Sequence, residues 1–491
     1  MKLPFLSGDL GALVSLAEGV RLRPEDLREQ IALRMQIFQA LGFRAGQFVL
    51  LAHGNSHYFF LDLFALWELG LCCIPVDTQL SQPELLNLAR HSGSVGLIYR
   101  KVIPHQDLQA ELGGEFLWLE TESLSEMPVK FSIQPDSGVD WDAPALILYT
   151  SGSTGEPKGV VHSFRSLLAR LYLLRPYVPL SRLERSLNLL PTHFGHGLIC
   201  NCLYPLLNGK TLILLPPFSL NTLKDLGEIL TQERIRFMSS VPSLWKMALK
   251  LSAPPSQDTL ELVHCGSAPL SLDLRKQIQE WTRIDRVKNT YGITETGSWL
   301  AGTEENCTQF CDGYIGEAWG SDLWVIQDQE AVIETCKPGE VGKVLVRTPA
   351  LMQGYYKRPD LTQAALLNGW FQTGDLGYLD AKGRLVLVGR KRHEINRGGM
   401  KIYPEDLDLA LERSPLVKEA CTFAYPDEIA GQNIGVALVL TDGVDLRTVK
   451  DWFKTQISAH KMPTQWYPVA QIPKTSRGKL NRERVAQAVR P

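Results

Sequence analysis

Apolar residues along the first hundred positions follow two alternating periods. Segment 24–41 repeats apolar side chains at helical spacing, and segment 48–53 is a short apolar run that predicts a strand. The alternation continues with a predicted helix at 59–70, a strand at 72–77, a helix from Gln82 to Arg90 and a strand at 95–100. Regular exchange of strand and helix predicts βαβ units and a parallel sheet.

The middle of the chain shows a second series of the same kind, with predicted strands at 210–215, 236–241 and 261–266. After about Gly320 the pattern changes to short strands separated by turn signals, for example KPGEVGKVLVRT at 337–348. This change predicts a small β-rich subdomain attached to a layered α/β body.

Beyond Arg392 about a hundred residues carry their own strands and helices, which is enough for a small domain. The predicted fold is therefore α/β, with a large N-terminal domain of layered subdomains and a small, mobile C-terminal α+β lid. The predicted boundaries are 1–388 for the N-terminal domain, 389–392 for a hinge and 393–491 for the lid.

Composition narrows the function class. A chain of 491 residues with 44% hydrophobic and 21% charged residues resembles an ordinary globular protein of two or more packed units. The formal net charge of −2 leaves no basic surplus to neutralise a phosphate backbone, so nucleic-acid binding is not expected. A small-molecule substrate is expected instead.

The most apolar stretch, 59–76, contains Asp62 and Glu68 and is interpreted as a buried helix leading into a strand, not as a membrane span. The N-terminus has no cleavable-signal pattern, so a cytoplasmic location without integral membrane association is expected. Nine scattered cysteines indicate reduced thiols. Cys307 and Cys311 have no second ligand pair nearby, so no zinc site is predicted there.

The first chemical motif is ALILYTSGSTGEPKGVVHS at 145–163, an apolar strand followed by glycines, hydroxyls and a lysine. Glycines allow backbone N–H groups to approach phosphate oxygens closely, so the loop predicts a phosphate site. The spacing differs from that of a P-loop, since no hydroxyl follows the lysine. The predicted phosphate-binding residues are Thr150, Ser151, Gly152, Ser153, Thr154, Gly155 and Lys158.

TSGSTGEPKG resembles the signature loop of the adenylate-forming superfamily, which includes acyl-CoA synthetases, aryl-acid and amino-acid adenylation domains and luciferases. The resemblance covers nearly the whole chain, because further family motifs follow in order. NTYGITETG at 289–297 resembles the adenine and magnesium segment. It implies that Tyr291 lies against adenine, Thr294 contacts the α-phosphate and Glu295 holds Mg²⁺, an ion that prefers oxygen ligands. Asn289, Thr290 and Gly292 complete this segment.

Three more segments carry the resemblance into the nucleotide site. GWFQTGDLGYLD at 369–380 resembles the ribose motif, which implies that Asp375 accepts hydrogen bonds from the ribose. Arg390, in LVGRKRHEI, matches the family's arginine that also reaches the ribose. HCGSAPL at 264–270 resembles the wall shared by the adenine and acyl pockets, with Gly266 and Ser267 at the nucleotide.

PKTSRGKLNR at 473–482 resembles the family segment whose lysine, here Lys479, reaches from the lid to the substrate carboxylate and the α-phosphate. Two anions must approach each other there, and a cation at about 4 Å contributes roughly 4 kcal/mol at an effective dielectric constant near 20. The predicted catalytic residues are therefore Lys479, Thr294 and Glu295.

The family's second half-reaction requires the lid to rotate so that a thiol can replace the lysine. Arg392 occupies the hinge position, and Gly398, Gly399 and Lys401 would line a tunnel for a pantetheine arm. A simple β-turn in the small domain is the alternative interpretation of this glycine pair.

Amino-acid-activating relatives place an aspartate where this chain has Phe194, and a buried ammonium without a counter-charge is costly. A non-amino aryl or short-to-medium-chain acid is therefore expected. The predicted acyl pocket comprises Phe194, His193, Val241, Ser267 and Ala268. The histidines of HFGH, at 193 and 196, have no third ligand nearby and are interpreted as pocket lining or core packing.

The predicted cosubstrates are ATP with Mg²⁺, a small carboxylic acid and a thiol, most favourably CoA. A phosphopantetheinyl group on an acyl or peptidyl carrier protein is the open alternative, and a monomer or homodimer is expected. An inactive scaffold with the same fold is disfavoured, because the charged motif residues Lys158, Glu295, Asp375, Arg390 and Lys479 are all present. Nothing in the sequence specifies a luciferase-like oxygen step.

Overall fold

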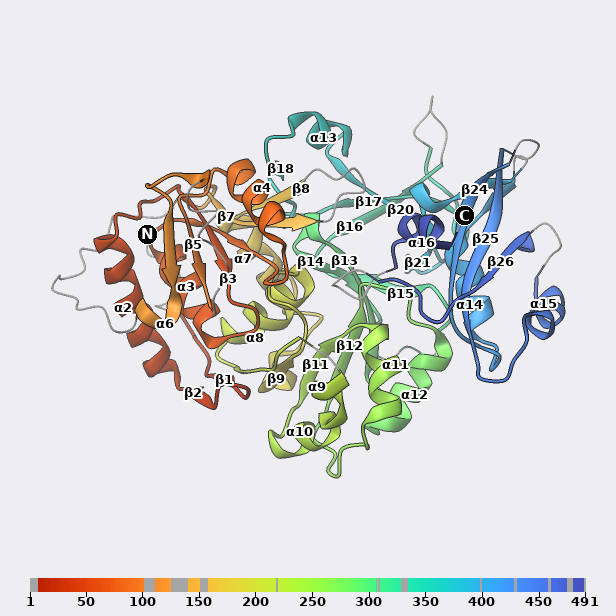
Figure 1. Cartoon of the computed structure of the whole chain (residues 1–491), viewed down its shortest axis with the longest axis horizontal. Coiled ribbons are helices and arrows are strands. Elements are labelled where there is room, and N and C mark those ends of the chain that lie inside the picture. Colours follow the sequence, from red (N-terminus) through yellow and green to blue (C-terminus); the bar gives the residue numbers. More distant parts are fainter. Residues whose placement is uncertain are drawn as a thin grey trace.

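The computed structural model describes residues 8–100, 111–124, 140–150, 158–217, 220–305, 307, 310–327, 334–397, 400–427, 431–457, 461–474 and 480–489. A large N-terminal part carries two sheets, and a smaller C-terminal part at the blue end of the chain carries a third (Figure 1). The predicted fold class, a layered α/β body with a small C-terminal α+β domain, is confirmed. No helix within the described ranges has the length and hydropathy needed to span a membrane.

The first sheet contains the βαβ units predicted from the alternating periods. Strands β4, β3, β5 and β6 are parallel, β7 extends them in parallel, and β8 and β18 add antiparallel pairs. The strands lie in the order β18 (Gly354–Tyr355), β8 (Lys158–Ser163), β7 (Pro144–Thr150), β4 (Cys72–Pro75), β3 (Phe48–Ala52), β5 (Gly96–Tyr99) and β6 (Leu117–Glu120). Associated helices are α2 (Pro24–Ala40), α3 (His57–Glu68), α4 (Gln82–Ser92), α6 (Thr121–Leu124) and α7 (Phe164–Leu173).

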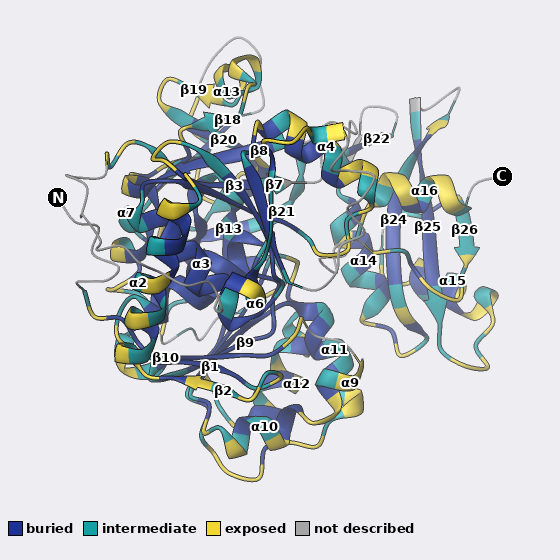
Figure 2. Cartoon of the chain, turned by 60° about the vertical axis from the view of Figure 1, so that its left-hand side comes forward, coloured by how far each residue is buried: buried dark blue, intermediate teal, exposed yellow. Residues whose placement is uncertain are grey.

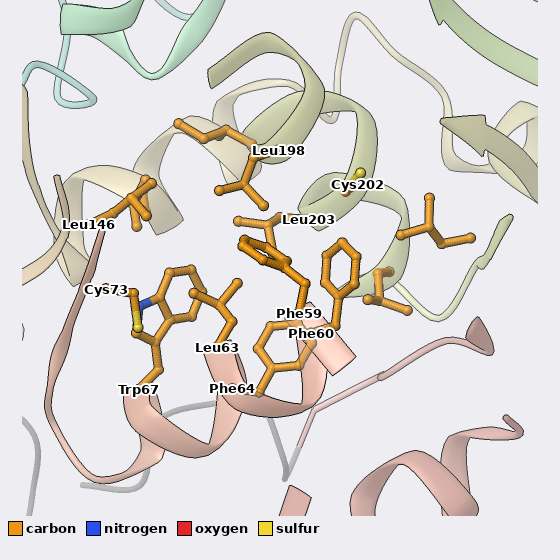
Figure 3. Close-up of a cluster of buried hydrophobic side chains, with 14 of the residues drawn as sticks. Phe59, Phe60, Leu63, Phe64, Trp67, Cys73, Leu146, Leu198, Cys202 and Leu203 are labelled. Atoms are coloured by element: carbon orange, nitrogen blue, oxygen red, sulfur yellow. The ribbon is translucent and has the colours of Figure 1, made fainter. Parts of the chain in front are cut away.

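Helix α3 accounts for the most apolar stretch of the sequence. The Ser56 side chain caps its N-terminus by accepting from the Tyr58 N–H, and most of its residues are buried. Figure 3 shows its aromatic side chains packed among Leu146 of β7 and Leu198 and Leu203 of the neighbouring π-helix η2 (His196–Leu203). Full burial of one such side chain contributes about 1.5–3 kcal/mol, so this cluster joins the layers of the N-terminal part. The interpretation of 59–70 as a buried helix is confirmed.

The second sheet changes from parallel to antiparallel along its length. Its neighbours from β1 through β10, β9, β11 and β12 to β13 are parallel, and every pair beyond β13 is antiparallel. The order is β16 (Asp322–Ile326), β17 (Gly342–Arg347), β20 (Trp370–Leu379), β21 (Leu385–Arg390), β15 (Tyr314–Ala318), β14 (Ser298–Gly302), β13 (Val287–Ile293), β12 (Leu262–Gly266), β11 (Phe237–Ser240), β9 (Arg185–Asn188), β10 (Thr211–Leu214), β1 (Leu13–Ser15) and β2 (Val20–Leu22), with β19 (Leu366–Leu367) beside β20. The antiparallel end is the predicted β-rich subdomain.

Two separate cores cover the faces of the parallel part of this sheet. One face packs against α9 (Leu220–Lys224), α10 (Leu226–Gln232), α11 (Pro242–Leu251) and α12 (Leu272–Thr282). The other face joins the core of the first sheet through the π-helix η2 (His196–Leu203) and α8 (Tyr204–Leu206). Figure 2 shows buried strands inside and exposed positions on the outer helices. Short elements elsewhere are η1 (Leu180–Leu183), η3 (Thr294–Thr296), α13 (Pro359–Ala364) and η4 (Lys391–His393).

The C-terminal part is a small sheet with helices packed against it. Its strands are β23 (Met400–Ile402), β22 (Ile395–Arg397), β25 (Gly431–Leu440) and β24 (Val417–Asp427), with β26 (Gln465–Pro468) beside β25, and its helices are α14 (Pro404–Glu412), α15 (Leu446–Lys454) and α16 (Arg482–Val489). It contacts the N-terminal part through Lys246, whose Nζ lies 2.5 Å from the Glu412 carboxylate, and through an Arg413–Asp312 ion pair. The predicted hinge at 389–392 covers the end of β21 and the start of η4, and it stays a prediction.

Candidate active site

The carboxyl ends of β12 and β13 bring several predicted nucleotide residues together. Gly266 and Thr290 pair across these parallel strands at the point where β12 ends. A Cβ at Gly266 would overlap the carbonyl and hydroxyl oxygens of Thr290, so only glycine allows this close approach. Strand β13 then leads directly into the turn η3, which carries Thr294 and Glu295.

Hydrogen bonds to three consecutive backbone carbonyls hold this turn in place. His162 Nε2 donates to the Thr294 carbonyl at 2.7 Å, the Met352 N–H to the Glu295 carbonyl at 2.7 Å, and Arg170 Nε to the Thr296 carbonyl at 3.0 Å. The donors come from β8, from the segment after β17 and from α7. Because all three acceptors are satisfied from outside the turn, the side chains of Thr294 and Glu295 project from a fixed backbone.

Two of these donors are buried ionisable side chains that the sequence patterns did not single out. Burial lowers the pKa of His162 to about 4, so the imidazole is neutral at pH 7 and keeps the N–H that it donates. Burial also lowers the pKa of Arg170, to about 10, and its guanidinium additionally donates to the Trp319 carbonyl at 2.9 Å. Both lie within strongly apolar stretches, where periodicity indicates only core positions.

Glu295 and Lys158 meet at a tyrosine from a distant strand. The Tyr355 hydroxyl donates to Glu295 Oε1 at 2.8 Å, and Lys158 Nζ lies 3.6 Å from the centre of the Tyr355 ring. Burial and the nearby Glu295 charge raise the pKa of Tyr355, which keeps its hydroxyl protonated. Tyr355 belongs to β18, which pairs with β8, the strand that begins at Lys158. The predicted magnesium ligand and the end of the predicted phosphate loop are therefore neighbours.

The candidate ribose residues form a second connected group. Asp375 and Arg390 are directly paired across β20 and β21, and Arg390 Nε lies 2.8 Å from Asp375 Oδ1. The Tyr291 hydroxyl donates to the other carboxylate oxygen, Oδ2, at 2.5 Å. The Asp375 charge raises the pKa of Arg390, so the guanidinium stays charged at pH 7. Tyr291, Asp375 and Arg390, predicted from separate motifs, thus form one unit.

Not every residue of the NTYGITETG segment points to this site. The Asn289 amide donates to the Tyr314 carbonyl at 2.8 Å, inside the sheet. A Cβ at Gly292 would overlap the Ser298 backbone, at the bulge between β13 and β14. These contacts give both positions a role in positioning the strand.

The predicted acyl residues lie beside the same strand ends. Phe194 is buried just before η2, His193 Nε2 lies 3.6 Å from an Asp77 carboxylate oxygen, and Val241 is buried at the start of α11. Ser267 Oγ lies 2.8 Å from Nδ1 of His196, and Ala268 is exposed. Within the described residues no group of histidine, cysteine, aspartate or glutamate side chains is arranged to hold a metal ion. The interpretation of the HFGH histidines as lining or packing residues stays a prediction.

Several predicted residues lie outside the described part of the chain, namely Ser151, Gly152, Ser153, Thr154, Gly155, Gly398, Gly399 and Lys479. For Thr150, Arg392 and Lys401 the structure describes the backbone, which ends β7, forms part of η4 and lies in β23. These positions stay predictions.

The segment that carries Lys479 is flanked by two anchors. Lys474 and Leu480 form an antiparallel bridge, and Lys474 is ion-paired with Glu419. On the other side, Arg482 Nη1 lies 2.6 Å from Asp408 Oδ2 and 2.7 Å from the Thr422 carbonyl.

The same arginine is connected to His393, the residue directly after the predicted hinge. Arg482 Nε lies 3.3 Å from Glu405 Oε1, and this oxygen lies 2.8 Å from His393 Nδ1 in η4. Burial of Arg482 opposes its charge, but the two carboxylates outweigh that effect and raise its pKa.

Comparison with known proteins agrees with this arrangement. The sequence model of the family described as AMP-binding enzyme matches residues 8–356, and that of the AMP-binding enzyme C-terminal domain matches residues 406–479. The chain belongs to the AMP-binding enzyme family. The match includes the strands and turns that carry the candidate nucleotide residues up to Tyr355.

Individual relatives of this family match over nearly the full length. A sulfoacetate–CoA ligase of Cupriavidus necator is 30% identical over 91% of this chain and 88% of its own, and a feruloyl-CoA synthase of Amycolatopsis sp is 28% identical over 94% and 93%. The solved structure of the o-succinylbenzoate CoA synthetase from Bacillus subtilis, in complex with an acyl-adenylate intermediate, has a TM-score of 0.85 at 24% identity, covering 98% of this chain and 95% of that one.

Proposed function

We propose that this chain is an ATP-dependent carboxylic acid–CoA ligase. It converts an acid to its acyl-adenylate with release of pyrophosphate and then transfers the acyl group to the thiol of CoA. Family membership and the CoA ligase names of its relatives support this reaction class. The single observation that carries it is the convergence of Glu295, Lys158, Asp375 and Arg390 beside the carboxyl ends of β12 and β13.

The first half-reaction requires charge to be held in position. A carboxylate is a poor acyl donor, because its leaving group would be oxide; attack on the α-phosphate of ATP makes that oxygen part of AMP, a better leaving group. Asp375 and Arg390 would hold the ribose, and Lys158 would lie along the phosphates. Glu295 is the hard-oxygen ligand for a Mg²⁺ ion otherwise held by water and phosphate, which would screen the departing pyrophosphate.

Lys479 is proposed to bring the two anions of this step together. The bridge between Lys474 and Leu480 closes the segment that carries it, and Arg482 fixes the following helix to α14. The lid thus supplies a cation at the position where carboxylate and α-phosphate must approach each other.

The second half-reaction is proposed to follow rotation of the lid about residues 389–392. Thiol attack on the acyl carbonyl forms the thioester and releases AMP. CoA is favoured as the thiol because the relatives that match nearly the whole chain are named as CoA ligases. A carrier-protein phosphopantetheine remains the second candidate acceptor.

The acid is proposed to be a non-amino carboxylic acid. Phe194 and Val241 are both buried, and neither supplies a counter-charge for an ammonium group. A cytoplasmic location is proposed, since ATP and CoA are both available there.

The proposal is tested by acid-dependent pyrophosphate release across aryl, aliphatic and dicarboxylic acids, with MgATP present and CoA added or omitted. Mass spectrometry should find the acyl-CoA only when acid, ATP and CoA are all present. Replacing CoA by a phosphopantetheinylated carrier protein distinguishes the two acceptors. Absence of pyrophosphate release with every acid would refute the proposed function.

A further inference from the structure

Polar side chains continue inward from Ser267 along one face of the second sheet. Ser239 of β11 and His264 of β12 occupy paired positions, so both project to the same face. His196 of η2 lies over this face, with Nδ1 2.8 Å from Ser267 Oγ and Nε2 2.6 Å from Ser239 Oγ. The Trp299 ring centre lies 5.7 Å from that of His196 and 4.5 Å from that of His264. We call Ser267, His196, Ser239, His264 and Trp299 the polar strip.

The polar strip runs from the surface of the site into the interior. Ser267 is partly exposed and is followed by the exposed Ala268, whereas His196 is 4% exposed and Ser239 and His264 are fully buried. Ser267 also adopts a positive φ of 65°, which is uncommon for a residue with a side chain. That backbone conformation directs the strand end toward His196 at the mouth of the predicted acyl pocket.

The inner end of the strip has hydrogen-bonding capacity that the protein does not use. Neither ring nitrogen of His264 has a hydrogen-bond partner in the described part of the chain, and the same holds for the indole N–H of Trp299. A buried polar group without a partner costs about 1–3 kcal/mol. Three such atoms on neighbouring rings indicate a place where a ligand atom completes the hydrogen bonding.

We propose that the polar strip is the surface that recognises the body of the acid, and that it fits an uncharged body carrying a hydroxyl or carbonyl oxygen. This inference rests on the proposed ligase function. A neutral His196 has one N–H, so one of its two serine partners accepts from it and the other donates to it. In either tautomer Ser267 retains one hydrogen-bonding function for a ligand hydroxyl, and the unpartnered N–H groups of His264 and Trp299 can each donate to an acceptor oxygen.

A second carboxylate is a poorer fit at this depth. Burial, with Lys288 and His196 close by, holds the pKa of His264 well below its ordinary value, so this ring carries no charge at pH 7. Lys288 lies on the same face, but its Nζ is 3.3 Å from Oε2 of Glu305, whose other oxygen pairs with Arg182 and Arg286. A carboxylate buried against the uncharged rings costs several kcal/mol, and a hydrocarbon body would leave the polar atoms unpartnered.

Matched acids test this directly. Two triplets are compared by kcat/KM in the pyrophosphate assay: hexanoate, 6-hydroxyhexanoate and adipate; and 3-phenylpropanoate, its 4-hydroxyphenyl analogue and its 4-carboxyphenyl analogue. One or two hydrogen bonds of about 1 kcal/mol each predict that kcat/KM for the hydroxylated acid of at least one triplet exceeds that of its hydrocarbon counterpart about 5- to 30-fold. The dicarboxylic acid should be the poorest substrate of that triplet.

Variants of the polar strip test whether it causes the preference for the hydroxylated acid. His264→Leu and His196→Leu should reduce the hydroxyl-to-hydrocarbon ratio of kcat/KM to near one, because the hydroxylated acid loses more than its hydrocarbon counterpart. Ser186→Ala is the matched control: this serine of β9 is buried in the same sheet and donates to the Leu183 carbonyl at 3.0 Å, and its ratio should equal that of the wild type. Ser267→Ala serves if a histidine variant fails to fold.

The outcomes separate the two claims. If no acid releases pyrophosphate, the proposed ligase function itself is refuted. If acids are activated but the hydrocarbon or dicarboxylic member is preferred in both triplets, or if the variants leave the ratio unchanged, the ligase function stands and the role of the polar strip is refuted.

Discussion

Replacing Arg482 by methionine should separate the two half-reactions. The side chain is 10% exposed, its Nη1 lies 2.6 Å from Asp408 and 2.7 Å from the Thr422 carbonyl, and Nε lies 3.3 Å from Glu405. Arg482→Met removes the cation from the buried Asp408 carboxylate, while Glu405 keeps its contact with His393, a loss of about 3–5 kcal/mol in the lid. If 3 kcal/mol of this loss were transmitted fully to the docking of the Lys479 segment, adenylation would slow roughly 150-fold.

Because Lys474 still anchors the other end of the segment, we expect a smaller effect, about 10- to 100-fold on the rate of pyrophosphate release. Transfer of the acyl group from a supplied acyl-adenylate to CoA should change less than about 3-fold, since Lys479 takes no part in it. Arg484→Met is the control, because Arg484 is an exposed arginine on the same helix.

Arg482→Lys, which restores a cation, should recover part of the adenylation rate. Equal loss of both half-reactions would show that the variant disrupts the lid as a whole. Unchanged adenylation in a folded but destabilised variant would show that Arg482 does not position the lysine segment.

The remaining predictions concern the nucleotide half of the site. Lys479→Ala should nearly abolish pyrophosphate release while transfer from a supplied acyl-adenylate survives, and equal loss of both would contradict the proposed division of labour. Glu295→Gln should raise the Mg²⁺ concentration needed for half-maximal activity about tenfold or more, measured by Mg²⁺ titration at fixed ATP; an unchanged requirement would exclude Glu295 as the ligand. The pKa of His162 is about 4 in the folded chain against 6.5 ordinarily, so between these values only the unfolded state gains a proton on this side chain. The unfolding free energy should therefore fall by up to about 3 kcal/mol as pH falls from 6.5 to 4, and His162→Gln, which keeps an N–H donor, should lack this component in urea unfolding at each pH. An identical pH dependence in the variant would refute the assignment.

Local sequence patterns were enough to predict most of the helices and strands. The periodic segments at 24–41 and 82–90 became α2 and α4, and each begins with a proline in its first turn, where the missing N–H costs nothing. Segment 59–70 was recognised as a buried helix from its embedded acidic residues and its length. The π-helix at 196–203 could not be predicted, since its HGLICNCL sequence has no period that distinguishes it from an α-helix.

The candidate site was predictable only where motifs carry it. Asp375, Arg390 and Tyr291 were predicted from separate motifs. Asp375 and Arg390 are neighbours through strand pairing, and the Tyr291 hydroxyl contacts the same carboxylate. Tyr355 was missed because its partner Glu295 is 60 residues away and no motif surrounds it. His162 and Arg170 were missed because their side chains donate to backbone carbonyls. Every residue has a backbone carbonyl, so the sequence pattern does not indicate such a partner.

The hydrogen bonds that His162, Met352 and Arg170 donate to the carbonyls of η3 have a consequence for how this enzyme can be altered. The backbone of η3 is held through main-chain acceptors of Thr294, Glu295 and Thr296, which any residue would supply, whereas the polar strip consists entirely of side chains. Replacing His196, Ser239 or His264 therefore leaves every hydrogen bond to the η3 backbone in place. Substrate choice can thus be redesigned at these positions without altering the turn that carries Glu295.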